Sequence, residues 1–185
     1  SISQENGNSV LRYVDLPLSE ELSFSINEVM SSISFDFPPI GVKDGWTSEW
    51  HMELSSWFEK SSKILKKGSL LIVDYILEAY RYYNSMRDSG TLIAYMNNNA
   101  SEDILRDSGK CDLTSHLCLE TLRFYAEKNR WVFLADQSQG LALLSLGLAQ
   151  KLHSLQLLNS NEIALALQSR ENLLRLVDPH CLGSF

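Results

Sequence analysis

The chain has 185 residues, of which 44% are hydrophobic and 21% charged, and its formal net charge is −7. This composition is ordinary for a globular protein, and the length suits one domain, so we expect residues 1–185 to form a single domain. The acidic balance argues against nucleic acid as a partner, because phosphate attraction needs a basic face. No stretch of about 18 apolar residues is present, so no membrane span is expected.

The cysteines are too few and too scattered for a disulfide framework. There are three of them, Cys111, Cys118 and Cys181, and an odd, sparse count favours a reducing compartment such as the cytoplasm. His116 lies between the first two, but a structural metal site needs about four ligands, and no second pair of ligands follows nearby. We therefore expect no metal site.

The first third of the chain alternates short apolar runs with turn signals. Residues 10–16 alternate loosely and predict a strand. Ser19, followed by two glutamates, can cap a helix that runs to about Ser32. Paired prolines exclude a helix from 35–45, which we expect to be a loop. Apolar residues at spacings near 3.6 then predict a helix over 47–67.

Residues 69–76 form the most informative apolar stretch. Four consecutive apolar residues are followed by Asp74 and Tyr75. A short run that is apolar on both faces predicts a buried strand of a parallel sheet, and therefore an α/β fold. The polar residues 84–112 predict a long loop.

The last third is dominated by helical patterns. Apolar residues share one face over Leu119–Asn129, which predicts a helix. A strand is expected over 131–137, and leucine-rich helices over 141–158 and 161–177.

Asp74 and Tyr75 are candidates for a ligand site because of their position. In doubly wound folds ligands bind outside the carboxyl ends of the strands, which is where both side chains would lie. Asp74 has an equally plain alternative, in which it caps the next turn or pairs with Arg81.

A second candidate group is formed by Asp112, Thr114 and His116. If the segment is extended, alternate positions place these side chains on one side of it. Asp112 or Thr114 could instead cap a following turn. Ser115 next to His116 lacks the G-x-S-x-G context of a nucleophile, and no glycine-rich phosphate loop is present.

Ordered sequence blocks carry a family resemblance. The stretch GWTSEWHMELSSWFEKSSKILKKGSLLIVDYI resembles a segment of MidA-like S-adenosylmethionine-dependent methyltransferases, of the class I type. Four further blocks follow in the same order, with the last one closest to the cyanobacterial branch: AYRYYNSMRDSGTLIAY, CDLTSHLCLETL, QGLALLSLGL and LLRLVDPHCLGSF.

The resemblance implies an α/β, partial Rossmann-like class I methyltransferase fold with additional C-terminal helices. It implies S-adenosyl-L-methionine as cofactor, a protein side chain such as arginine as acceptor, and a link to assembly of respiratory complex I, in mitochondria if the source is eukaryotic. The family's glycine-rich cofactor loop has no counterpart in this sequence. We therefore expect a C-terminal portion that is inactive alone, whose partners are the N-terminal half of the same protein or a second copy bound through an exposed sheet edge.

The alternative is a non-catalytic interaction module or a degenerate homologue, because Ile76, Cys118 and Ala142 depart from the family pattern. Under the enzyme interpretation, carboxylates would hold an arginine guanidinium, and aromatic and polar groups would shape the pocket around it. The resemblance assigns catalytic roles to Asp74, Tyr75 and Glu49 and substrate binding to Tyr95, Asp112, Thr114, His116 and Gln139.

Overall fold

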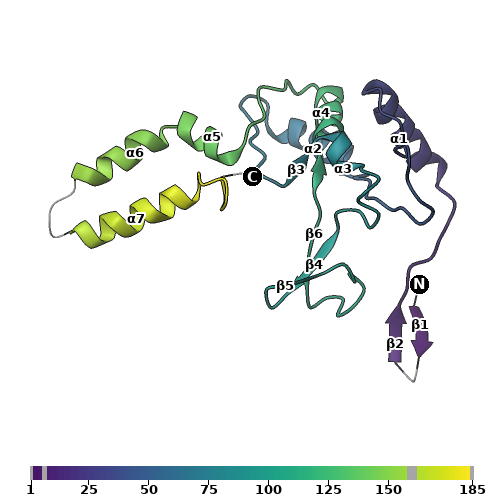
Figure 1. The fold of residues 1–185 in the computed structure, drawn as a ribbon. Coiled ribbons are helices and arrows are strands. Elements are labelled where there is room, and N and C mark those ends of the chain that lie inside the picture. Colours follow the sequence, from purple (N-terminus) through teal and green to yellow (C-terminus); the bar gives the residue numbers. More distant parts are fainter. Residues whose placement is uncertain (1, 6–7, 158–161, 184–185) are drawn as a thin grey trace. The chain divides into compact units, whose positions relative to one another are not determined.

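The computed structural model describes residues 2–5, 8–157 and 162–183, in which helices alternate with short strands (Figure 1). The strands are β1 (Ile2–Glu5), β2 (Asn8–Leu11), β3 (Ile76–Leu77), β4 (Ile93–Met96), β5 (Asn99–Ser101), β6 (Asp112–Thr114) and β7 (Leu117–Cys118). The helices are α1 (Glu20–Ser32), α2 (Leu54–Ile64), α3 (Ala79–Tyr82), α4 (Leu119–Lys128), α5 (Gln139–Ser145), α6 (Leu148–Ser154) and α7 (Ile163–Arg175), with a 3₁₀ turn over Leu155–Leu157.

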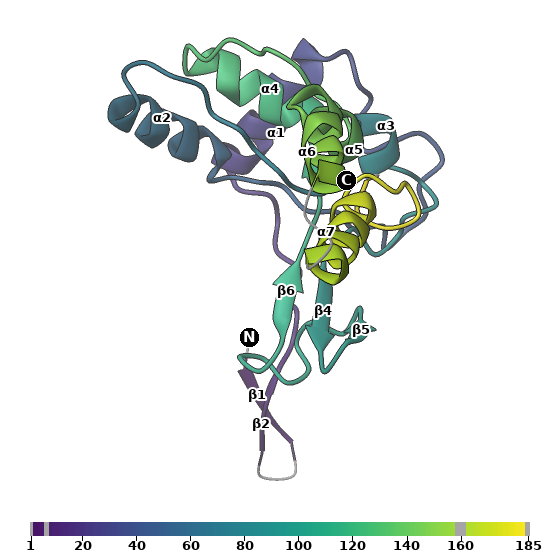
Figure 2. The same cartoon turned by 90° about the vertical axis from the view of Figure 1, so that its left-hand side faces the viewer.

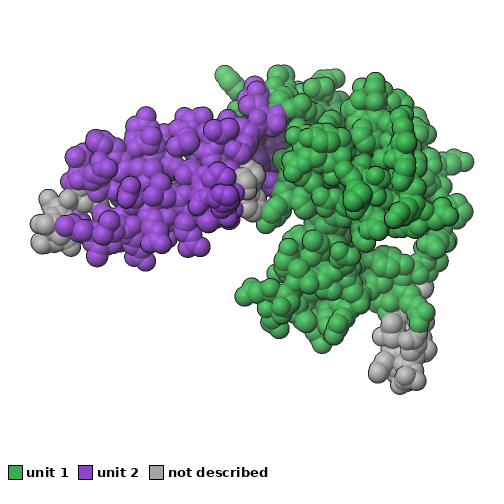
Figure 3. Space-filling model, in the orientation of Figure 1, with its two compact units in different colours: residues 1–69, 75–133 green, residues 70–74, 134–185 purple. Residues whose placement is uncertain are grey.

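The predicted single domain contains two compact units (Figure 3). Unit 1 comprises residues 1–69 and 75–133, and unit 2 comprises residues 70–74 and 134–185. Unit 1 contains all of the strands and α1 to α4. Unit 2 contains the helices that follow residue 134.

A parallel strand pair with a helix after each strand is the centre of unit 1. β3 pairs with β7 in parallel, with Ile76 opposite Leu117. α3 starts just after β3, and α4 starts directly after β7. Oε2 of Glu120, in the first turn of α4, accepts a hydrogen bond of 2.7 Å from the backbone N–H of Ala79. One carboxylate thus caps the neighbouring helix, where an anion is favoured.

The core of unit 1 lies between α1, α3 and the parallel pair. Its buried members are Ile26, Met30, Leu77, Ala79, Tyr82, Tyr83 and Cys118. Figure 2 shows α1, α2, α3 and α4 grouped around this region, with the β4–β6 strands extending from it. A hydrogen-bonded chain crosses the same core, because Ser25 Oγ accepts from Trp50 Nε1 at 2.9 Å and bonds the Tyr125 hydroxyl at 2.7 Å.

The segment predicted to be a long loop, 84–112, contains a hairpin. β4 pairs antiparallel with β5 through Met96 and Asn99, and the two residues between them, Asn97 and Asn98, have φ of 49° and 62°. Positive φ at both central residues defines the hairpin turn that twisted strands favour, and asparagine tolerates it well. β6 pairs with the other edge of β4.

Two predicted strands are absent, and the reason is the lack of a pairing partner. Residues 69–75 and 131–137 belong to no strand, and only Ile76–Leu77 of the first segment enters a ladder. A strand needs a neighbouring backbone for its N–H and C=O groups. Tyr75 accepts one backbone hydrogen bond, from Leu117, and no described strand is paired with the rest of these segments. The strand predicted over 10–16 is replaced by β2, which ends at Leu11.

The helix predictions hold in position but not in length. Ser19 caps α1 as expected, accepting the Leu22 N–H at 3.1 Å. α2 is shorter than 47–67, because Thr47 forms a parallel bridge with Ser89 instead of a helical turn. The helix predicted over 141–158 is divided by Gly147, whose φ is 97°, a conformation that only glycine adopts without strain. The end of that prediction and the start of the next, residues 158–161, lie outside the described residues.

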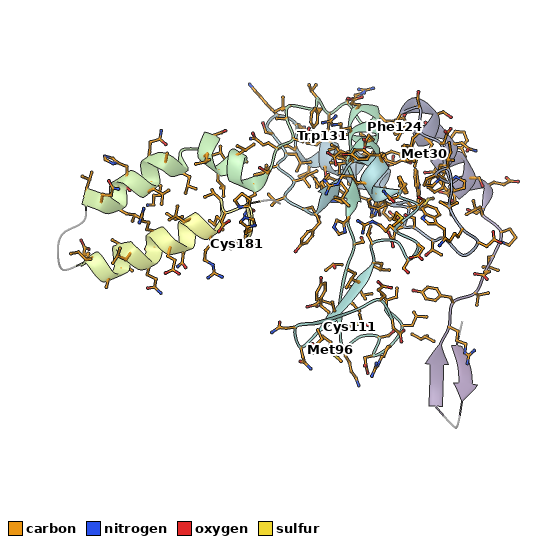
Figure 4. The ribbon with its side chains drawn as sticks, in the orientation of Figure 1. Met30, Met96, Cys111, Phe124, Trp131 and Cys181 are labelled. Atoms are coloured by element: carbon orange, nitrogen blue, oxygen red, sulfur yellow. The ribbon has the colours of Figure 1, made fainter. Side chains whose placement is uncertain are left out.

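Each of the three cysteines is a free thiol. Figure 4 labels Cys111 beside Met96 at the end of the β4–β6 strands and Cys181 near the end of the chain. Among the described residues, no group of histidines, cysteines and carboxylates has the arrangement of a metal site. No helix within the described ranges is long and apolar enough to cross a membrane.

Candidate functional site

Glu49 lies in the middle of a hydrogen-bonded network in unit 1. Its Oε1 accepts from the backbone N–H groups of Thr91 at 2.9 Å and Leu92 at 3.1 Å. Its Oε2 accepts from the Thr91 hydroxyl at 2.9 Å and the Tyr82 hydroxyl at 3.3 Å. These four donors fill about the four lone-pair positions that a carboxylate offers.

Gly90 makes this close approach feasible. Its φ is 77°, and a Cβ atom placed on it would overlap Oε1 of Glu49. A residue with a side chain would therefore meet both backbone strain and a steric clash at this position. The Gly-Thr-Leu sequence of residues 90–92 is thus the binding partner of the Glu49 carboxylate.

His51 and Tyr82 extend the network toward the residues of the predicted site. The Nε2 atom of His51 lies 3.0 Å from the backbone oxygen of His116 and 3.2 Å from the Tyr82 hydroxyl. A carbonyl oxygen only accepts, so the hydrogen-bond pattern assigns the proton to Nε2 of His51. Burial raises the pKa of Tyr82 above its ordinary value, so its phenol stays protonated and donates to Glu49.

The network brings three of the predicted site residues together: Glu49, Tyr75 and His116. The backbone N–H of His116 donates to Thr91 Oγ1 at 3.1 Å. The His116 ring lies 5.7 Å from the Tyr75 ring, centroid to centroid, with the planes tilted by 56°. Both residues immediately precede the parallel strand pair β3–β7, and Leu117 N–H donates to the Tyr75 oxygen at 2.9 Å.

Three more predicted residues lie on the β4–β6 strands that continue from this network. Tyr95 is directly opposite Asp112, and Thr114 is opposite Ile93. Directly opposed residues of an antiparallel pair project to the same face, so Tyr95 and Asp112 share a face. Tyr95 is 42% exposed, and Asp112 is also exposed. The strand β6 gives Asp112 and Thr114 the extended backbone that the sequence pattern requires.

The remaining two predicted residues, Asp74 and Gln139, belong to unit 2. Asp74 is exposed. Gln139 donates through Nε2 to the backbone oxygens of Leu176 at 3.2 Å and Leu182 at 3.1 Å. Its next neighbour, Gly140, donates its N–H to the Gly183 oxygen at 3.0 Å. Gln139 therefore anchors the turn after α7 to the start of α5.

Sequence reasoning missed His51, Tyr82 and Thr91. Tyr82 and Thr91 stand inside a block that carries the family resemblance, yet nothing in their spacing pairs them with Glu49, which lies 33 and 42 residues away. A clue is Gly90, since a glycine often marks a position where another group approaches the backbone closely.

Comparison with known families identifies the class of protein. Residues 2–135 match the model of a family described as "Putative S-adenosyl-L-methionine-dependent methyltransferase". The match covers well over half of the chain, so the chain belongs to this family. The methyl donor of the family is S-adenosyl-L-methionine, as the sequence resemblance implies.

Two solved structures from Burkholderia thailandensis are similar to the chain. One is a COG1565 superfamily member bound to S-adenosyl-homocysteine, with 19% identity and a TM-score of 0.75. The other is a native structure of a COG1565 superfamily protein, with 18% identity and a TM-score of 0.77. Each similarity covers 99% of this chain. They confirm the predicted α/β, partial Rossmann-like fold with its additional C-terminal helices.

The chain spans less than half of these solved proteins. It covers 44% of the first and 45% of the second. No curated protein matches the chain.

Proposed function

We propose that this chain is the acceptor-side part of an S-adenosylmethionine-dependent protein methyltransferase of the MidA-like type, inactive without the rest of the fold. Arginine is the proposed acceptor, and assembly of respiratory complex I is the proposed setting, in the cytoplasm or in mitochondria. The family match over residues 2–135 supports the reaction class.

The observation that carries the acceptor assignment is the exposed pair Tyr95 and Asp112. An aromatic face and a carboxylate side by side are the groups that hold a guanidinium, through cation–π attraction and charge-assisted hydrogen bonds. Tyr75 and His116 add a pair of rings near the other end of the same strands. Asp74, Glu49, Thr114 and Gln139 complete the set of residues that the resemblance assigns.

S-adenosylmethionine supplies an activated methyl group when it is bound. The described residues offer acceptor groups and rings but no glycine-rich cradle for the donor, because the glycines stand singly along the chain. The chain's own contribution to the reaction is therefore to orient the acceptor, which can lower the barrier by presenting the reacting atoms in a favourable geometry.

The proposal includes a polypeptide partner that completes the sheet. In unit 2, Leu71 and Val73 are 77% and 65% exposed, and in unit 1 Val132 is 80% exposed. These apolar side chains lie in the segments that no described strand pairs with, as expected where a further strand is to be added. The proposed occupant is the cofactor-binding part of the fold, since the chain covers under half of the similar structures.

The decisive experiment compares S-adenosylmethionine binding and methyl transfer to an arginine peptide by two samples. One is the chain alone, and the other is the chain extended upstream until it matches the length of the solved proteins. We expect the first sample not to bind S-adenosylmethionine, and the second to bind it and to methylate the peptide. In the second sample, Asp112→Asn should raise the KM for the arginine peptide tenfold or more. Asp103→Asn, an exposed change on the same unit, is the control. An extended protein that binds no donor would refute the enzyme assignment.

The same pair of samples tests the partner. Sedimentation should show the chain alone self-associating through its unpaired segments and the extended protein remaining monomeric. If the chain alone is monomeric and Leu71→Lys changes nothing, the surface is not a docking site.

A second candidate function is a non-catalytic interaction module. The observation in its favour is α7, which has no buried residue and exposes Ile163, Leu165 and Leu167. Under this alternative, Leu165→Glu abolishes partner capture, whereas Asp112→Asn leaves it unchanged.

A further inference from the structure

The backbone of His116 is held at both of its polar atoms by side chains that are distant in sequence. Its N–H donates to Thr91 Oγ1 at 3.1 Å, across 25 residues. Its carbonyl oxygen accepts from His51 Nε2 at 3.0 Å, across 65 residues. The place of His116 next to Tyr75 is therefore set by Thr91 and His51.

Thr91 connects the His116 N–H to Glu49 through hydrogen bonds. A threonine hydroxyl has one hydrogen, and that hydrogen is donated to Glu49 Oε2 at 2.9 Å. The lone pairs of the same oxygen are therefore available to the His116 N–H. Hydrogen bonds in such a chain polarise one another, so the charge of Glu49 strengthens the bond to His116.

His51, together with Tyr82, connects the His116 carbonyl to the same oxygen of Glu49. His51 Nε2 approaches the Tyr82 hydroxyl at 3.2 Å, and that hydroxyl donates its own hydrogen to Glu49 Oε2 at 3.3 Å. Tyr82 is fully buried, and Thr91 is 2% exposed. Water cannot readily replace these bonds. The hydrogen bonds through Thr91 and those through His51 and Tyr82 therefore define one arrangement of His116.

We propose that Glu49 is a positioning residue that fixes His116 against Tyr75, through Thr91 on one side and Tyr82 with His51 on the other. It does not touch the acceptor, because the four protein donors already occupy its oxygens. The proposal refines the role of one residue in the proposed function, and His51, Tyr82 and Thr91 join it as positioning residues. Only the relevance of the His116–Tyr75 pair to an acceptor rests on that proposed function.

The first test compares Thr91→Val with Thr91→Ser by amide hydrogen exchange and by the proton shifts of the His116 ring. Valine keeps the shape but lacks the hydroxyl, so we expect exchange of the His116 N–H to rise about tenfold. The ring shift should move toward the value in Tyr75→Leu, which lacks the neighbouring ring. Serine should restore both readouts.

Thr47→Val is the matched control. Thr47 belongs to the same unit, and its hydroxyl donates to the backbone oxygen of Asp88 at 3.2 Å instead of to Glu49. The His116 exchange rate should stay within about twofold of that of the unchanged chain.

The second test addresses the hydrogen bond from His51 to His116 and does not depend on the folding of the Thr91 variants. Nitrogen NMR of the unchanged chain should show His51 protonated at Nε2. His51→Gln keeps a donor near that position and should preserve the His116 ring shift, whereas His51→Leu should lose it.

Two results would overturn the proposal: equal His116 exchange in the valine and serine variants, or a proton at Nδ1 of His51 with Nε2 unprotonated. Neither measurement involves a methyl donor or acceptor. A chain that passes both tests but never binds S-adenosylmethionine would leave the positioning network intact and refute only the methyltransferase function.

Discussion

At the level of single residues, Glu49 matches a family block as an acceptor-binding carboxylate would, yet its oxygens bind groups of the protein itself. The sequence places a carboxylate in a family block, where an acceptor-binding role is reasonable. The structure shows that its oxygens are engaged by Thr91, Leu92 and Tyr82. Asp112, on β6 of the same unit, is the exposed carboxylate to which the proposed function assigns the guanidinium.

Replacing Glu49 by glutamine should destabilise the chain by about 3 kcal/mol, because one oxygen becomes an NH₂ group that faces donors. Glu127→Gln, on the exposed end of α4, is the control and should change the unfolding free energy by less than about 0.5 kcal/mol. Urea unfolding of the two variants measures the difference. Equal stabilities would mean that the Glu49 bonds do not form in solution.

The neighbouring tyrosines should respond in opposite ways to loss of the hydroxyl. Tyr82→Phe removes a donor to Glu49 and should cost about 1 to 2 kcal/mol. The Tyr83 hydroxyl is buried without a hydrogen-bond partner among the described residues, so Tyr83→Phe should be neutral or stabilising. Thr121 is close enough to influence the pKa of Tyr83, but their hydroxyls do not meet hydrogen-bond geometry. A large loss of stability in Tyr83→Phe would reveal a partner such as buried water.

At the level of elements, the turn at Gly90 allows a comparison of backbone strain with steric overlap. Gly90 and Gly109 have φ of 77° and 85°, but only the first has a heavy atom within reach of an added Cβ. Gly109→Ala should therefore cost about 1 kcal/mol from strain alone, and Gly90→Ala about 2 kcal/mol more. Combining Gly90→Ala with Glu49→Ala in a double-mutant cycle should remove most of that excess. Additive costs in thermal unfolding would contradict the close approach.

The connection between α5 and the turn after α7 depends on Gln139. Gln139→Glu would direct an anion at two carbonyl oxygens, whereas Gln139→Met only removes the donors. The glutamate variant should lose about 1 to 2 kcal/mol more than the methionine variant. Exchange of the Gly140 N–H, which donates to the Gly183 oxygen, reports the loss. Similar exchange in both variants would show that the turn is held by packing instead.

For the whole molecule, the buried tyrosines predict an alkaline limit to stability. Burial raises the pKa of both Tyr82 and Tyr83 above the ordinary value of about 10. Above that pH the unfolded chain loses protons that the folded chain retains, so stability is constant with respect to these groups below pH about 10 and falls as the pH rises further. Tyrosinate absorbance should therefore increase in two phases, with the second coinciding with loss of helical circular dichroism. A single early phase would contradict the burial.

The sequence was informative where structure is decided locally and uninformative where it depends on distant partners. Ser19 and the apolar spacing were enough to predict α1, and a shared apolar face predicted α4. The apolar segments at 70–73 and 131–134 have the composition of buried strands, but a strand forms only beside another backbone. The role of Glu49 depends on bonds across 33 to 43 residues, which no local pattern encodes.

The chain of hydrogen bonds through Ser25 has a consequence for synthesis on the ribosome. Ser25 in α1 meets Tyr125 in α4, and Glu28 meets Lys128, each across 100 residues. Contacts between such distant positions form late, because the intervening segment must first be made and ordered. Helix α1 therefore lacks its partner α4 until the 100 residues that separate these contacts have been translated, and during this interval chaperones have access to the side of α1 that α4 later covers.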